Sequence, residues 1–120
     1  RIGEIAQATA AVFGGNVDYE MIWGAPPVIN DDKMAALAAK AAKTVAGEDH
    51  VITEVKAPNM GGEDFAFMSE KVPGVYMQVG LGDEGHTAQL HNPGFDFNDL
   101  GLAYAARTFA AIVQERLPLN

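Results

Sequence analysis

The sequence lacks cysteine, has few basic residues and contains no long apolar run. Without cysteine, neither a disulfide nor a cysteine-ligated zinc site can form within these 120 residues, and a reducing, cytoplasmic location is favoured. Only 8 lysines and arginines stand against 16 aspartates and glutamates, so the net charge is −8. Nucleic acids and anionic membrane surfaces repel such a chain, and we expect neither as a partner. No apolar run approaches the roughly 20 residues that a membrane-spanning helix needs.

What is present suits a small folded unit. Hydrophobic residues make up 48% of the chain, which predicts a real core in one compact domain. The first residue is Arg1, and it already lies inside a helical pattern. We interpret this start as that of a fragment of a longer protein.

The first quarter of the chain predicts one helix and one strand. Apolar residues follow helical spacing from Ile2 to Phe13, and a glycine pair follows them. Apolar and acidic residues then alternate over residues 17–23, the pattern of a strand with one buried face. The segment 24–31 carries two adjacent prolines, which stiffen the chain. We therefore divide the chain into residues 1–25 and residues 26–120.

The second part predicts alternating helices and strands. An apolar stripe runs from Met34 to Val45, with acidic residues at its start and a glycine after its last turn. The expected elements that follow are a strand at 51–55, a helix at about 63–70, a strand at 75–79 and a helix at about 99–117 that Pro118 ends. Such alternation predicts an α/β fold with helices on the faces of a sheet.

Two stretches stand outside these elements. One is the glycine loop Met60, Gly61, Gly62, Glu63 and Asp64, and the other is a loop over residues 81–97. Loops longer than about 12 to 15 residues are usually functional or disordered. The glycine pair leads into a predicted helix start, where backbone N–H groups could receive a carboxylate or an oxyanion. The alternative is a plain turn followed by acidic residues that suit the helix dipole, which explains the same residues.

Histidines are the other candidates. His91 lies in the sequence Leu-His-Asn-Pro, where a proline and two nearby phenylalanines could hold the imidazole as a metal ligand. A solvated or hydrogen-bonded histidine is the alternative that the residues themselves favour. His86 and His50 lie in polar stretches, and we expect both to be exposed and without function.

Taken together, the stretches "MGGEDFAFMSEKVPGVYMQVGLG" and "LHNPGFDFNDLGLAYAARTFAAIV" resemble the C-terminal part of hippurate hydrolase-like and N-acyl-amino-acid amidohydrolases. These are relatives of aminoacylase and of carboxypeptidase-type dinuclear metallopeptidases. The resemblance covers most of the chain from Asn30 onward. The first part is similar to the end of the family's ferredoxin-like lid domain, in which a helix and a strand precede the return to a zinc-peptidase-like α/β catalytic domain.

This resemblance implies a metal-dependent hydrolase that cleaves the amide bond of N-acyl amino acids or small peptides. His91 would be the last ligand of a site for two divalent metal ions, which could be zinc, manganese, cobalt or nickel. The glycine loop from Met60 to Asp64 would line the substrate cleft. The family's other ligands and its catalytic glutamate have no counterpart in these residues, so we assign no catalytic residue here and expect the fragment alone to be inactive.

Three interpretations remain open at this point. The first is a fragment of such an enzyme, and the second is a non-catalytic α/β module that binds carboxylates through the glycine loop. The third is an interaction role, in which the strand expected at 17–23 pairs with another chain. The family's lid often forms a homodimer, so the third interpretation is compatible with the first.

Overall fold

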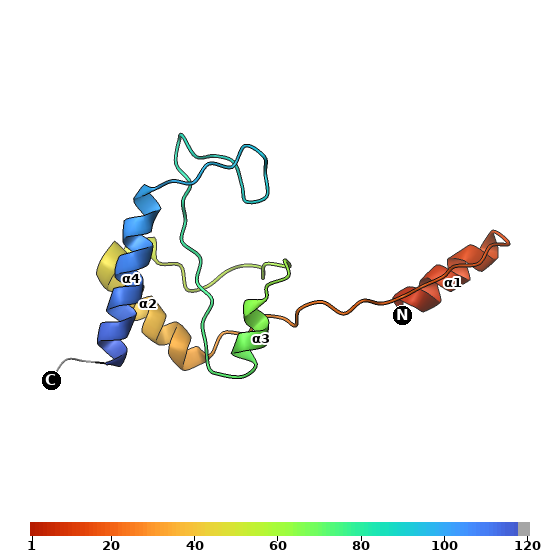
Figure 1. The fold of residues 1–120 in the computed structure, drawn as a ribbon, viewed down its shortest axis with the longest axis horizontal. Coiled ribbons are helices and arrows are strands. Elements are labelled where there is room, and N and C mark those ends of the chain that lie inside the picture. Colours follow the sequence, from red (N-terminus) through yellow and green to blue (C-terminus); the bar gives the residue numbers. More distant parts are fainter. Residues whose placement is uncertain (118–120) are drawn as a thin grey trace.

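The computed structural model describes residues 1–117 and shows an open, helical molecule (Figure 1). The radius of gyration is 20.5 Å, whereas a compact domain of this length has a radius of about 14 Å. The described elements are α1 (Ile2–Val12), α2 (Asp32–Ala46), the short 3-10 helix η1 (Glu48–His50), α3 (Phe65–Ser69) and α4 (Leu100–Arg116). None of the helices in this range is long and apolar enough to cross a membrane.

The N-terminal helix α1 and the segment after it form a separate arm. Gly14 follows the helix with a φ of 68°, a left-handed conformation in which glycine avoids the clash of a side chain. The chain then turns back along α1. Gln7 Nε2 donates a hydrogen bond of 2.6 Å to Asn16 Oδ1, and the Tyr19 ring lies against Gly3. An extended segment joins this arm to the rest of the molecule, as Figure 1 shows.

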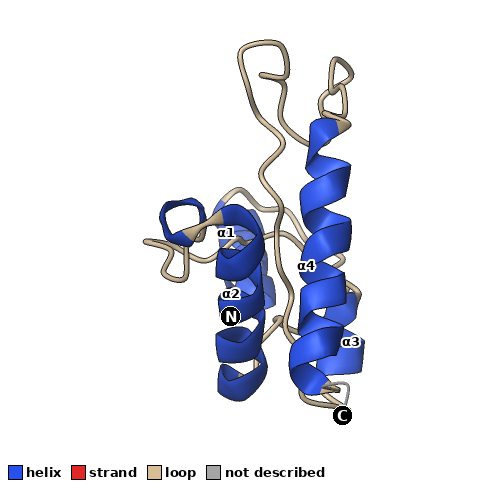
Figure 2. Ribbon diagram, turned by 90° about the vertical axis from the view of Figure 1, so that its left-hand side faces the viewer, coloured by secondary structure: helices blue, strands red, loops and turns tan. Residues whose placement is uncertain are grey.

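The framework of the second part is the pair α2 and α4, which pack against each other (Figures 1 and 2). Asp31 caps α2, because its Oδ1 accepts hydrogen bonds of 3.0 Å from the backbone N–H groups of Lys33 and Met34. Small side chains allow the close approach, and two alanines of α2 are buried. At the rim, Lys40 Nζ lies 2.6 Å from Glu115 Oε2.

The start of α4 is fastened to the long loop that precedes it. Gly101 is buried, and a Cβ added there would overlap with Leu81 Cδ2. Asn98 Oδ1 also accepts a hydrogen bond of 3.0 Å from the backbone N–H of Leu100. Leu81 and Asn98 stand near the two ends of the loop, so the start of α4 holds both ends.

The predicted α/β fold is wrong for this structure, because no β-strand occurs among residues 1–117 and the ribbon shows only helices and loops (Figure 2). The segments expected as strands, at 17–23, 51–55 and 75–79, are irregular. The zinc-peptidase-like sheet and the final strand of a ferredoxin-like lid are therefore not observed. A strand needs a paired neighbour to satisfy its backbone groups, and alternation of side chains does not supply one.

Segment 75–79 illustrates this correction. The side-chain amide of Asn30 takes the place of a neighbouring strand at Tyr76. Asn30 Oδ1 accepts a hydrogen bond of 2.8 Å from the Tyr76 N–H, and Asn30 Nδ2 donates one of 3.4 Å to the Tyr76 carbonyl. The backbone N–H of Asp31 donates to the carbonyl of Gly74 at 2.9 Å. The Asn30 side chain thus satisfies the backbone N–H and carbonyl groups of Tyr76, and no ladder between two strands forms.

The helix predictions are closer to the structure. Helices occur near all four expected places, and the observed ends differ by one or two residues, most at the short α3. The expected effect of Pro118 lies outside the described residues. The prediction of a real core is wrong for the described part, where the buried apolar side chains are Ala38, Ala41 and Ala66. Large apolar side chains stay exposed, including Trp23 at 87%.

Candidate functional site

The glycine loop is exposed and open on one side. Asn59 Oδ1 accepts a hydrogen bond of 2.9 Å from the backbone N–H of Gly61. Gly62 has no positive φ, and a Cβ added there would meet nothing within 4 Å. The fold itself therefore does not require glycine at position 62. Open space at this position is compatible with the close approach of a ligand to the backbone.

Glu63 is held by two hydrogen bonds from the protein itself. Its Oε1 accepts from the backbone N–H of Phe65 at 3.1 Å, and its Oε2 accepts from the Tyr76 hydroxyl at 2.8 Å. The bond from Phe65, and then that from Tyr76, lowers the pKa of Glu63 because both stabilise the carboxylate. The same contact raises the pKa of Tyr76. The rings of Phe65 and Tyr76 also pack, with centroids 5.5 Å apart.

These contacts give Glu63 a structural task in the described part of the chain. Both carboxylate oxygens are engaged in tying α3 to the segment around Tyr76, so Glu63 fixes the position of the glycine loop. Met60 and Asp64, the first and last residues of the loop, are exposed.

His91 has an unusual backbone. Its φ is 65°, and among residues 1–117 it is the only residue other than glycine with a positive φ. Such a conformation costs about 1 kcal/mol or more in a non-glycine residue and is found preferentially at functional sites. Hydrogen bonds on either side hold the turn: the Asn92 N–H donates to the Gln89 carbonyl at 3.2 Å, and the Phe95 N–H donates to the Asn92 carbonyl at 2.9 Å.

The imidazole of His91 is exposed, and no hydrogen bond to its ring occurs within the described part of the chain. A neutral imidazole without an internal partner fits the donor chemistry of a divalent metal ion. One donor does not make a site, however. The described residues contain no group of three or more His, Asp or Glu side chains that could hold a metal ion.

His86 is the residue that the sequence did not single out. Its side chain is 28% exposed, and its Nδ1 lies 2.7 Å from Asp83 Oδ1. That contact, followed by the backbone N–H groups of Gly85 and His86, lowers the pKa of Asp83. Asp83 Oδ2 accepts a further hydrogen bond of 2.9 Å from Asn98 Nδ2. The expectation of an exposed histidine was wrong in this respect, and a carboxylate three residues before it was the available signal.

A hollow of about 660 Å³ adjoins both predicted stretches. Asn59, which precedes the glycine loop, and Leu90, which precedes His91, both line it. His86 lines it as well. The five residues of the glycine loop and His91 are not themselves among the lining residues. The structure thus brings Asn59, which flanks the glycine loop, and part of the loop 81–97 to one concave surface, without a hydrogen bond between the glycine loop and His91.

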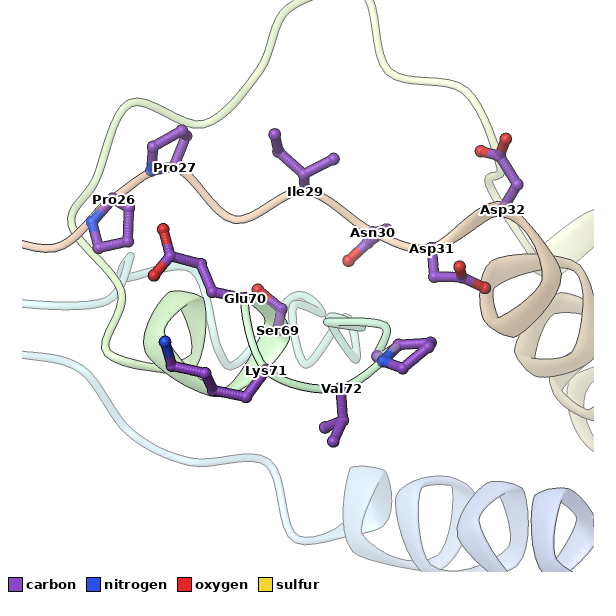
Figure 3. A pocket seen from close by; sticks show the side chains of 12 residues that line it. Pro26, Pro27, Ile29, Asn30, Asp31, Asp32, Ser69, Glu70, Lys71 and Val72 are labelled. Atoms are coloured by element: carbon purple, nitrogen blue, oxygen red, sulfur yellow. The ribbon is translucent and has the colours of Figure 1, made fainter.

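A second hollow, of about 640 Å³, lies between residues 26–32 and the end of α3 (Figure 3). Two prolines and Ile29 form one wall, and Glu70 and Lys71 stand on the other. Neither the residues predicted for the site nor their immediate neighbours line it. We therefore place the candidate site at the hollow beside His91.

The comparisons with known proteins identify the class of this chain. The model of peptidase family M20/M25/M40 matches residues 3–115. The chain therefore belongs to this family of hydrolases, which is generally metal-dependent. The recognition made from the two motifs is confirmed.

Three curated relatives illustrate the range of the match. A Bacillus subtilis N-acetylcysteine deacetylase is 33% identical over 90% of this chain and 27% of that protein. The IAA-amino acid hydrolase ILR1-like 2 of Arabidopsis thaliana is 27% identical over 98% of this chain and 27% of that protein. A Rhodococcus jostii protein with the provisional name glutamate--cysteine ligase 2-3 is 38% identical over 82% of this chain, but only 13% of that protein.

The chain thus spans about a quarter of the length of these relatives, or less. The ligase name describes a protein of which most lies outside the match, whereas the two hydrolase names agree with the family. No solved structure matches the fold at a significant level.

Proposed function

We propose that this chain is the C-terminal part of a metal-dependent amidohydrolase that hydrolyses N-acyl amino acids or small peptides. The observation that carries the proposal is the left-handed backbone of His91, which directly follows Leu90, a residue that lines the hollow. The family match and the hydrolase names of two relatives support it. A non-catalytic carboxylate-binding module remains the alternative.

In this proposal each stretch has one task. Two divalent metal ions, when bound in the whole protein, would supply an activated water and a Lewis acid for the amide carbonyl. His91 would provide one imidazole nitrogen to one of these ions, and the other ligands and the general base would come from parts of the protein outside this chain. The glycine loop receives the carboxylate of the substrate. Glu63 keeps the loop in place through its bonds to Phe65 and Tyr76.

The division of the chain fits the same proposal. Residues 1–25 would end the smaller domain of the whole protein, and residues 26–120 would belong to its catalytic domain. The separation of the α1 arm supports this division (Figure 1). Exposed Phe13, Ile22 and Trp23 on the arm support association of the whole protein into a homo-oligomer. Light scattering of the whole protein with Trp23→Ser tests this, and an unchanged mass would contradict it.

His91→Ala in the whole protein tests the assignment. We expect this variant to lose most of its activity on a panel of N-acyl amino acids. It should also contain less bound metal, because one ligand is removed. His50→Ala is the matched control, since His50 is also exposed but lies in η1. The isolated 120-residue chain should be inactive and bind metal poorly. Equal kinetics and metal content for wild type and His91→Ala would overturn the assignment.

A further inference from the structure

The hollow beside His91 contains polar groups that the proposed chemistry does not use. His86 and Asp96 line it together with apolar residues that include Val79, Leu81 and Phe95. No lysine or arginine of the described chain is among its lining residues. The hollow therefore combines apolar walls with groups that accept hydrogen bonds.

Asp83 fixes the orientation of His86. A carboxylate with a lowered pKa is an acceptor, so His86 Nδ1 carries the hydrogen in their 2.7 Å contact. In the neutral ring, Nε2 then bears the lone pair. Asp83 is itself held by the Asn98 amide and by two backbone N–H groups, so it cannot rotate away without breaking them.

His86 Nε2 faces a second acceptor. It lies 4.0 Å from Asp96 Oδ2, too far for a direct hydrogen bond. Two acceptors at this separation suit a donor between them. An ammonium nitrogen that donates two hydrogen bonds of about 2.9 Å at a tetrahedral angle spans acceptors about 4.7 Å apart. A movement of less than about 1 Å in the exposed Asp96 side chain would complete that geometry.

We propose that this hollow binds a cationic group of the substrate, an aliphatic ammonium, with His86 and Asp96 as its acceptors. The alkyl stem would lie against Leu81 and Phe95. A divalent metal ion suits the place less well, because three ligating side chains do not meet anywhere in the described residues. The inference rests on the proposed function for the reaction that the substrate undergoes, but the binding itself can be measured separately.

The binding test uses two small probes of similar shape on the whole protein. n-Butylammonium carries the charge and n-butanol does not, and NMR signals of the His86 ring report the contact of either probe. We expect n-butylammonium to bind about three- to fivefold more tightly than n-butanol, a modest factor because the Asp96 side chain is 84% exposed. Added salt should reduce the difference.

Asp96→Asn should abolish the preference for the charged probe. Asp96 is so exposed that this change does not endanger the fold. Asp49→Asn, in η1, removes the same charge elsewhere and should leave the preference unchanged. Equal affinities for the two probes in wild type would overturn the inference, and so would a preference that Asp96→Asn leaves intact.

A kinetic comparison separates this inference from the proposed function. The ratio of kcat/KM for N-acyl-lysine over N-acyl-norleucine should exceed one in wild type and fall by the same three- to fivefold in Asp96→Asn and in His86→Gln. If neither substrate is hydrolysed while n-butylammonium still binds as expected, the proposed function fails and this inference stands. If both are hydrolysed equally and the two probes bind equally, this inference alone fails.

Discussion

The contact between Gly101 and Leu81 leads to a prediction about the stability of α4. Whether alanine at position 101 stabilises or destabilises this helix should depend on the Leu81 side chain. A Cβ at position 101 would overlap with Leu81 Cδ2, so Gly101→Ala forces the leucine side chain to move. Overpacking of this kind costs about 1 to 3 kcal/mol. Alanine in place of glycine in a helix returns up to about 1 kcal/mol, and less near the helix start. We therefore expect Gly101→Ala to destabilise α4 by about 1 kcal/mol.

The effect of Gly101→Ala on the stability of α4 should reverse when the Leu81 side chain is shortened. In a Leu81→Ala background the added methyl group meets no leucine tip, so the same glycine-to-alanine change should stabilise α4 by a few tenths of a kcal/mol, up to about 1. Native-state hydrogen exchange of the α4 amide groups in the whole protein measures the local free energy of opening. Gly80→Ala is the control, because a Cβ there meets nothing within 4 Å.

The reasoning is refuted if Gly101→Ala has the same sign and size in both backgrounds. The result also bears on the site, because this contact fastens the loop that carries His86 and His91. In the whole protein, weakening this contact should raise KM by a larger factor than the factor by which metal content falls.

Three further predictions concern the glycine loop and α2. The pKa of Glu63 is lowered in the folded state, so its stabilising effect is present above the ordinary glutamate pKa and is lost as the pH falls through the folded pKa. Acid titration of stability should therefore flatten in Glu63→Gln, and a titration identical to wild type would contradict this. Gly62→Val should raise KM or abolish turnover without lowering the melting temperature, because the added side chain meets open space in the protein but blocks a ligand; unchanged kinetics would remove the loop from the site. Asp31→Ala removes the cap of α2 and should cost about 1 kcal/mol in urea unfolding, whereas Asp31→Asn should cost far less.

The sequence predicted the helices well because their signals are local. Asp31 accepts hydrogen bonds from residues two and three positions away, and the apolar stripe of α2 repeats within the helix itself. The family was also readable from the sequence, since the glycine loop and the Leu-His-Asn-Pro motif are short and occur in a fixed order. Neither inference needs knowledge of distant contacts.

The wrong predictions all depended on distant partners. Alternation at 17–23 and the apolar run at 75–79 indicated strands, but a strand forms only where another backbone pairs with it, and at Tyr76 a side-chain amide does so instead. The hydrogen bond from Asn98 to Asp83 spans 15 residues, so no local pattern indicated it, whereas the contact of Asp83 with His86 is local. The left-handed backbone of His91, by contrast, belongs to a local turn held by hydrogen bonds between residues three positions apart.

Local chemistry in the sequence thus determined where helices begin and end and which family the chain belongs to. Tertiary structure alone decided that Glu63 holds the loop through Tyr76, that His86 faces Asp96 and that Gly101 sits under Leu81. The physical reason is that each of these contacts joins residues 10 or more positions apart in the sequence. The distance between such residues in space is set by the path of the whole chain, which no short stretch of sequence determines.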